Sequence, residues 1–420
     1  MIGGMGERAR SFFEKNAPFL VVPRGAARQP LAMTKKSHRV LCASKTSKAR
    51  LIISESEQGA DMFHATGFRA PDPFVYVESG GKSAILLNDL ELDRGSREAR
   101  VDEVVSQSDL AASLEKKSGR KPAPVEVIAV FLKKRGASRP LVPADFPLGL
   151  ARQLGEHGVA VTPVEGMFRP ERQIKTPGEI RLMTEATRIT EAGMERAFEV
   201  LRASMVGAGK VLRWGGAILT SERLRMEIEA TMLRAGAIPA GNSIVACGEQ
   251  ACDPHERGHG PLKANQLIIL DLFPRATSGY YGDLTRTVVK GKATEAQSRL
   301  WEVCLLGQKL ALGSLGHGAD GGAIHREVTD FFTDNGYPTE RVGGAKGRWS
   351  GFFHGTGHGL GLDLHEAPRF GAGKLKAGQV FTIEPGIYIP GIGGVRHEDV
   401  ALITKTGHKL LSRCPKPMEL

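Results

Sequence analysis

The sequence of 420 residues lacks the patterns that mark several common classes of protein. No apolar run approaches the roughly 20 residues that a membrane-spanning helix needs. The stretch APFLVVP near the N-terminus is also too short for the apolar core of a signal peptide. The five cysteines are scattered and never spaced as CxxC, which disfavours a disulfide framework. These absences predict a cytoplasmic protein with reduced thiols and no membrane partner.

The net charge of +11 is concentrated at the N-terminus. Residues 1–50 hold eleven Lys or Arg against two acids, so this segment alone carries +9. Such a basic arm is typical of nucleic-acid or ribosome binding. However, neither interleaved aromatic residues nor a recognised binding module accompanies the charge. We therefore expect a solvated, partly disordered leader over residues 1–45, and no nucleic-acid partner.

Regular patterning begins near Lys48. The apolar runs ARLIIS, FVYVES, SAILLND and VEVIAVFL predict strands, and PLGLARQLGEHG predicts a helix that ends at Gly158. The mixture indicates an α/β or α+β domain over residues 46–170. This region holds no cluster of acids or histidines that would indicate chemistry.

A second region begins at Thr176, where Pro177 and Glu179 complete the signature of a capped helix. Two helices are expected, one over residues 179–202 and one over residues 219–236, and a hairpin follows them. The order then repeats. A third helix opens with a capping box of Thr294 and Gln297, and a fourth runs from Asp320 to Gly336. A second hairpin follows this pair.

The two hairpins are related in sequence. LKANQLIILD runs from Leu262 to Asp271, and LKAGQVFTIE runs from Leu375 to Glu384. The Leu, Lys, Ala and Gln match in place, and an acid closes each copy. Both continue as a Gly-rich turn and a second strand, which is the signature of a hairpin. The repeat predicts two similar halves within one domain.

Each hairpin carries two acids, Asp271 and Asp283 in the first and Glu384 and Glu398 in the second. An isolated buried carboxylate costs several kcal/mol, and buried charge is kept only when it is paired or bound to metal. If the four acids converge they repel one another, and two divalent cations would cancel their charge. Carboxylates with one or two imidazoles suit Mn, Co, Fe or Zn.

Histidines lie between the hairpins and just before the first one. FFHGTGHGLGLDLHEAPR contains His354, His358 and His365, and PHERG contains His255. The glycines exclude a long helix, and no HExxH occurs, so this is not a paired-histidine zinc helix. Taken singly, each residue also has a structural interpretation, because Asp is common in turns and a lone His in a glycine loop usually makes a hydrogen bond. Their joint spacing favours a metal site.

The spacing resembles that of the pita-bread metallopeptidases, the family of methionine aminopeptidase, aminopeptidase P and prolidase. The resemblance extends from about Thr176 to Ile403 and rests on PHERG, IILDLF, GYYGDLTRTVV, HGTGHGLGLDLHEAP, FTIEPGIY and GGVRHEDVALIT. A weaker match, FHATGFRAPDP, resembles the N-terminal domain of creatinase, aminopeptidase P and prolidase. The resemblance implies an α/β N-terminal domain over residues 46–170. An α+β pita-bread catalytic domain with an internal pseudo-two-fold repeat is then expected over residues 175–415.

Carried over position by position, the resemblance implies a role for each site residue. Five look like the ligands of two metal ions: Asp271, Asp283, His358, Glu384 and Glu398. Asp283 and Glu398 would bridge both ions. The residues implied in catalysis are His255, His365 and Glu384, and those implied in substrate binding are His354, Arg369 and Arg396. One departure is a turn longer by one residue between Asp271 and Asp283, which predicts a looser turn and not a lost ligand.

The resemblance implies hydrolysis of the peptide bond before proline, by an Xaa-Pro aminopeptidase or an Xaa-Pro dipeptidase. Mn²⁺ is expected ahead of Co²⁺, Zn²⁺ or Fe²⁺, with proline-containing peptides as substrates and a homodimer as the assembly. One alternative is a methionine-type aminopeptidase, which normally lacks the N-terminal domain. Others are a creatinase-like hydrolase or a non-enzymatic pita-bread binding protein, both of which lose the ligands. The preferred peptide length and the role of the insertion at residues 207–225 stay open.

Overall fold

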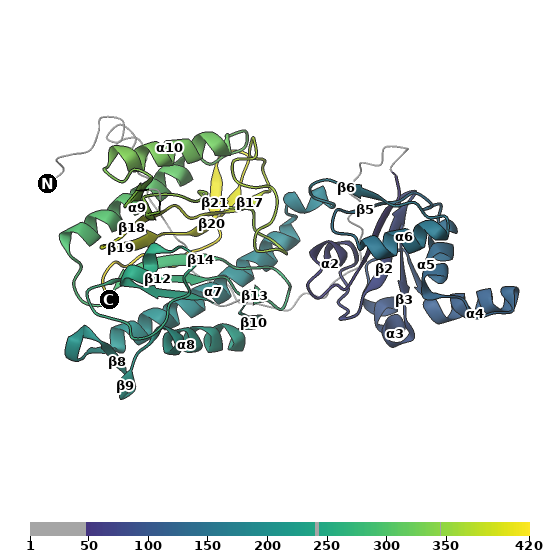
Figure 1. Ribbon diagram of the computed structural model, residues 1–420, viewed down its shortest axis with the longest axis horizontal. Helices are drawn as coiled ribbons and strands as arrows, with labels where there is room; N and C mark the ends of the chain where they lie inside the picture. Colours follow the sequence, from purple (N-terminus) through teal and green to yellow (C-terminus); the bar gives the residue numbers. More distant parts are fainter. Residues whose placement is uncertain (1–47, 240–242, 345) are drawn as a thin grey trace, which may run out of the picture. The chain divides into compact units, whose positions relative to one another are not determined.

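The computed structural model describes residues 48–239, 243–344 and 346–420. The basic leader expected over residues 1–45 lies outside this range. None of the described helices is long and apolar enough to cross a membrane. Two successive regions, each with its own sheets and buried apolar clusters, form an N-terminal and a C-terminal domain (Figure 1). Their expected boundaries, 46–170 and 175–415, stay predictions.

The N-terminal domain is built on a six-stranded mixed sheet in the order β4–β3–β2–β1–β5–β6. Its strands are β1 Arg50–Ser54, β2 Phe74–Ser79, β3 Lys82–Leu87, β4 Glu103–Ser106, β5 Leu141–Pro143 and β6 Thr162–Val164. Its helices are α2 Ala60–Thr66, α3 Asp89–Glu98, α4 Gln107–Ser118, α5 Pro124–Lys133 and α6 Leu148–Glu156. Successive strand residues face opposite sides, so Leu51 joins a core with α5 while Ile52 joins one with α2.

One predicted strand of this domain is wrong. The run VEVIAVFL lies within the helix α5. Pro124 occupies the first turn of this helix, where its missing N–H costs nothing, and Val127 and Phe131 are buried one turn apart. A short apolar run fits a buried strand and a buried helix equally well. The proline and the four-residue spacing were the signals that separated the two.

The first half of the C-terminal domain has the expected order of two helices and a hairpin. α7 Pro177–Ala203 begins at the predicted capping box, in which Thr176 Oγ1 accepts from the Glu179 N–H at 3.3 Å. After α8 Ser221–Arg234 comes the sheet β11–β12–β14, formed by Ile244–Cys247, Leu267–Leu272 and Leu284–Val289. Both helices bury an apolar face against it. The smaller elements are η1 Pro170–Gln173, β7 Met205–Val206, η2 Ala208–Lys210, β8 Leu212–Trp214, β9 Ala217–Ile218, β10 Ala237–Ile238, η3 Gly248–Cys252 and β13 Arg275–Ala276.

The second half repeats this order, as predicted. α9 Glu295–Gly313 begins at the capping box of Thr294 and Gln297, and α10 Gly321–Asp334 is capped by Asp320. The strands that follow are β15 Glu340–Val342, β16 Arg348–Ser350, β17 Val380–Ile383, β18 Gly386–Ile389, β19 Gly393–Arg396, β20 Asp399–Ile403 and β21 His408–Leu410. Figure 1 shows β12 and β14 of the first half and β18, β19 and β20 of the second between the α7–α8 pair and the α9–α10 pair. The pseudo-two-fold repeat read from the sequence is thus present in the fold.

The second hairpin is interrupted at its acids. β17 ends at Ile383 and β18 begins at Gly386, since Pro385 has no N–H to donate to a ladder. The partner strand is broken at the same level, between Arg396 and Asp399. The pairs Ile383–Asp399 and Gly386–Arg396 share one register, which places Glu384 opposite Glu398. Like charges directly opposite each other are destabilising. The two facing acids at this break therefore require a compensating positive charge.

Candidate metal centre

The predicted site residues meet in one pocket of the C-terminal domain, with a volume of about 870 Å³. All ten line it: His255, Asp271, Asp283, His354, His358, His365, Arg369, Glu384, Arg396 and Glu398. They come from the two hairpins, from the loop between α10 and β17, and from the segment after η3. Apolar side chains, among them Ile244, Phe273, Phe353 and Phe370, form the rest of the wall. The insertion at residues 207–225 contributes nothing to this lining among its described residues.

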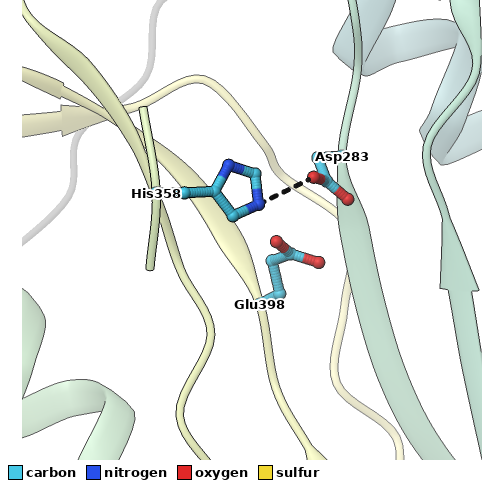
Figure 2. A group of neighbouring side chains, drawn as sticks. All are labelled: Asp283, His358 and Glu398. Carbon is cyan, nitrogen blue, oxygen red and sulfur yellow. Dashed lines mark ion pairs between the residues drawn. The ribbon is translucent and has the colours of Figure 1, made fainter. Parts of the chain in front are cut away.

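His358 faces the carboxylates with one ring nitrogen (Figure 2). Its Nε2 lies 3.5 Å from Asp283 Oδ2 and 3.4 Å from Glu384 Oε1. Its Nδ1 lies 3.1 Å from the carbonyl oxygen of Gly359. A carbonyl only accepts, so Nδ1 carries the proton and the Nε2 lone pair points at the acids. Metal-binding histidines are held in this orientation by such a bond from the other nitrogen.

Three residues offer ligand atoms within 4.8 Å of one another, namely Asp283, His358 and Glu398. Figure 2 shows that their side chains converge from separate segments of the chain. Burial raises the pKa of Asp283 and of Glu398 well above the usual range, and the neighbouring carboxylates raise it further. Burial also raises the pKa of Glu384 to about 7, where Asp271 adds to the effect and Arg396 opposes it. The cluster therefore lacks enough positive charge to balance its carboxylates.

The two carboxylate oxygens of Asp271 have different hydrogen-bonding environments. Oδ2 accepts from Arg396 Nη2 at 2.6 Å in a buried ion pair. Oδ1 is buried and has no hydrogen-bond partner among the described residues. Buried carboxylate oxygens are rarely left without a partner. An oxygen-rich set with one imidazole, a deficit of positive charge and an orphaned acceptor fits a divalent cation of the Mn, Fe, Co or Zn type.

The remaining predicted residues surround this cluster. His365, His255 and Arg369 are exposed to solvent within the pocket. The rings of His358 and His365 are nearly perpendicular, with centroids 4.4 Å apart. Burial lowers the pKa of His365, and the neighbouring His358 lowers it further. These three residues are therefore placed to meet a bound substrate, although their roles stay predictions.

His354 is buried deeper and belongs to a relay of hydrogen bonds. Its Nδ1 donates to Gly355 O at 2.8 Å, so Nε2 accepts from the Tyr388 hydroxyl at 2.8 Å. Tyr388 in turn accepts from Arg396 Nη1 at 2.8 Å. Burial, together with the charge of Arg396, lowers the pKa of His354 to about 3, which keeps the ring neutral. The relay connects His354 through Arg396 to Asp271.

Three residues of this arrangement were missed in the sequence, namely Thr285, Thr382 and Tyr388. Thr285 Oγ1 donates to Glu398 Oε2 at 2.7 Å. Thr382 Oγ1 accepts from the His358 N–H at 3.0 Å and lies 3.3 Å from Glu384 Oε1. Each threonine stands two residues from a predicted ligand, on the same face of an extended chain. That spacing was a usable signal.

Comparisons with known proteins agree with this geometry. Residues 181–405 match metallopeptidase family M24. The chain is 32% identical over 260 residues to an Xaa-Pro dipeptidase of Pyrococcus horikoshii, covering 61% of this chain and 67% of that protein. It is 33% identical over 273 residues to an Xaa-Pro aminopeptidase of Haemophilus influenzae, covering 59% of each chain.

A solved structure extends the likeness to both domains. The crystal structure of the prolidase from Pyrococcus horikoshii matches with a TM-score of 0.69 and 26% identity, over 88% of this chain and 94% of that one. The expected fold, an α/β N-terminal domain followed by a pita-bread domain, is confirmed. The family match contains all five predicted ligands and spans more than half of the chain. The protein is therefore a hydrolase of metallopeptidase family M24, which depends on divalent metal ions.

Proposed function

We propose that this protein hydrolyses the peptide bond before proline, as an Xaa-Pro aminopeptidase or Xaa-Pro dipeptidase. The observation that carries the proposal is the convergence of four carboxylates and His358 in one pocket. The names of the relatives support the choice of an Xaa-Pro bond. The presence of an N-terminal domain argues against a methionine-type aminopeptidase. The complete set of acids argues against a binding protein that has lost its ligands.

Five residues are proposed to hold two divalent ions, with Mn²⁺ as the first candidate: Asp271, Asp283, His358, Glu384 and Glu398. Asp283 and Glu398 are only 4% and 2% exposed, and they are the pair that both ions would share. When bound, such ions act as Lewis acids and lower the pKa of water. The protein itself supplies the orientation, since Thr285, Thr382 and Arg396 each bond to one of these carboxylates.

Each of the other site residues has a proposed role in the reaction. Glu384 accepts a proton from the attacking water and passes it to the imino nitrogen of proline. His365 and His255, on the exposed side of the pocket, donate hydrogen bonds to the substrate carbonyl as negative charge develops on it. Arg369 pairs with the carboxylate of the peptide, and His354 and Arg396, which also line the pocket, contribute to substrate binding.

Two peptides and a control test this proposal. The metal-reconstituted full chain is given Gly-Pro, an Xaa-Pro-Yaa-Zaa tetrapeptide, and a Met-Ala-Yaa peptide without proline at the second position. Turnover of either proline peptide supports an Xaa-Pro peptidase, and the faster one identifies the dipeptidase or the aminopeptidase. Turnover of the methionine peptide alone would contradict the proposal, as would no turnover at all. The homodimer and the cytoplasmic location stay predictions.

A further inference from the structure

One buried carboxylate in the wall of the pocket has no role in the proposed reaction. Glu366 follows the exposed His365 directly, yet it is only 4% exposed. Its Oε2 accepts from the backbone N–H of Leu362 at 3.0 Å and of Asp363 at 3.3 Å. The chain over residues 359–368, here called the site loop, therefore folds around this carboxylate. A Cβ on Gly361 would lie 2.5 Å from Glu366 Oε2, so the loop closes tightly here.

Two cationic side chains from the segment before α7, Arg172 and Lys175, form ion pairs with Glu366. Arg172 Nη2 lies 2.6 Å from Glu366 Oε2 and 2.6 Å from Asp363 Oδ2. Lys175 Nζ pairs with Glu366 Oε1 and also donates to Arg172 O at 2.5 Å. Arg172 Nη1 reaches Asp61 of α2 at 2.6 Å. Arg172 and Lys175 are 5% and 6% exposed, so their ion pairs with Glu366 are almost fully shielded from water.

The cluster stays ionised despite its burial. Burial alone would raise the pKa of Glu366, but Lys175 and Arg172 bring it below the usual range. Replacing a buried ion cluster by apolar groups of similar size is often neutral or stabilising. Stability alone therefore does not account for three buried charges at this place. A requirement for one defined conformation of the loop would account for them.

The loop conformation reaches the metal centre through one carbonyl group. The Glu366 N–H donates to Gly359 O at 2.8 Å. The same oxygen accepts from His358 Nδ1 at 3.1 Å, the bond that turns Nε2 toward the carboxylates. His365 lies beside Glu366 in the loop, and its ring packs against that of His358. An anchored Glu366 thus fixes both histidines.

We propose that Arg172 and Lys175 are positioning residues for the metal centre. By holding Glu366 they fix the site loop, which orients His358 toward the metal-binding carboxylates and His365 toward the substrate. The effect on the substrate rests on the proposed peptidase function. The effect on His358 does not, because it is measured by metal binding alone.

The test compares two buried arginines in the full chain, Arg172→Gln and Arg169→Gln. Arg169 is three residues away and 8% exposed, but it pairs with Glu78 and Glu171 and not with the site loop. Co²⁺ is titrated into the metal-free protein and its absorption spectrum is followed, because the spectrum reports the coordination geometry. Mutation of a residue that orients a metal ligand typically lowers metal affinity by about 10–100-fold. We expect a loss of this size and an altered spectrum in Arg172→Gln, and neither in Arg169→Gln.

Further variants separate positioning from folding. Glu366→Gln should repeat the loss, and Arg172→Lys should recover part of it because it keeps the charge but not the planar fork. If Arg172→Gln does not fold, Arg172→Lys carries the same comparison with a smaller expected loss. Co²⁺ binding by Arg172→Gln that equals that of the unaltered protein would overturn the proposal. An equal loss of affinity in Arg169→Gln would also overturn it. A protein that binds Co²⁺ but cleaves no Xaa-Pro peptide would refute the proposed function and leave this test intact.

Discussion

The carboxylates of the candidate metal centre differ in the side chains that they contact. Asp271 is paired with Arg396, and Glu398 accepts a hydrogen bond from Thr285. Glu384 contacts His358 and the Thr382 hydroxyl. The Glu384 side chain is 19% exposed, against 12% for Asp271 and 5% for Asp283, so it is more accessible from the pocket. It is thus the acid best placed to exchange a proton during the reaction.

Glu384→Gln should lower kcat severely, by about 10²–10⁴-fold, because the amide keeps the size but accepts no proton. The measurement is kcat and KM on the better of the two proline peptides. Metal content of the same sample is determined in parallel, since the amide is also a weaker ligand. A kcat within threefold of the unaltered enzyme, at full metal content, would exclude Glu384 as the proton acceptor.

Arg369→Ala should raise KM and leave kcat nearly unchanged, if its contact is equal in the ground and transition states. A dipeptide ends in a carboxylate directly after proline, so the lost charge-assisted contact should cost about 1.5–3 kcal/mol. A tetrapeptide places its carboxylate farther away and should lose less. Arg257→Ala serves as the control, because Arg257 is also exposed but is not among the residues that line the pocket. Equal losses on both peptides would contradict carboxylate capture.

Close packing between structural elements sets the positions of His358 and Glu384. The loop that carries His358 runs against β17, where the His358 carbonyl accepts from the Thr382 N–H at 2.9 Å. The Glu384 N–H donates to Thr356 O at 2.7 Å on the same side. Gly357 lies between these two bonds, and a Cβ there would stand 1.8 Å from Thr382 O. The glycine is required by the approach of two backbones.

Gly357→Ala should force the loop away from β17, with a cost of about 1–3 kcal/mol or more in folding free energy. We expect a lower midpoint of thermal unfolding together with weaker Co²⁺ binding. Gly355→Ala is the matched control in the same loop, since its Cβ would meet Gly357 O at an ordinary 3.6 Å. Similar unfolding midpoints and Co²⁺ affinities for the two variants would show that the loop does not depend on this approach.

The molecule as a whole combines two domains in one chain with a metal centre in the second. Metal that binds only the folded state stabilises it by mass action, by about 2.7 kcal/mol at a hundredfold excess over Kd. Treatment with a chelator should therefore lower the midpoint of unfolding and abolish peptidase activity. Mn²⁺ or Co²⁺ should restore both. Unchanged turnover in a verified metal-free sample would contradict a metal-dependent reaction.

Deletion of residues 1–32 should leave kcat and KM on a short Xaa-Pro peptide nearly intact. These residues lie outside the described part of the chain, and the sequence places neither site residues nor core patterning in them. The measurement is the kinetics of the shortened and the full chain, side by side. A large fall in kcat for a shortened protein with an unchanged unfolding midpoint would show that the leader contributes to the pocket.

Local patterns in the sequence were sufficient for the C-terminal framework, and the resemblance to the metallopeptidases completed the proposed set of ligands. The capping boxes at Thr176 and Thr294 mark helix starts because the cap and its partner are three residues apart. The hairpins were recognisable because LKANQLIILD and LKAGQVFTIE share Leu, Lys, Ala and Gln in place and each ends in an acid. The run VEVIAVFL misled because a short apolar run fits a strand and a helix alike, and the signals of Pro124 and the four-residue spacing were not used. Signals within one element were thus read correctly where spacing distinguished the alternatives.

Only the tertiary structure decided which partners hold the site in place. Arg172 and Glu366 are 194 residues apart in the chain, and Thr285 and Glu398 are 113 apart. Nothing in the local sequence around Arg172 distinguishes it from the neighbouring Arg169, yet only the former pairs with the site loop in the described contacts. Such pairs form when the chain closes around a buried carboxylate that must find a donor. The proposed ligands were therefore read from the sequence, while the residues that orient them depend on distances that folding alone establishes.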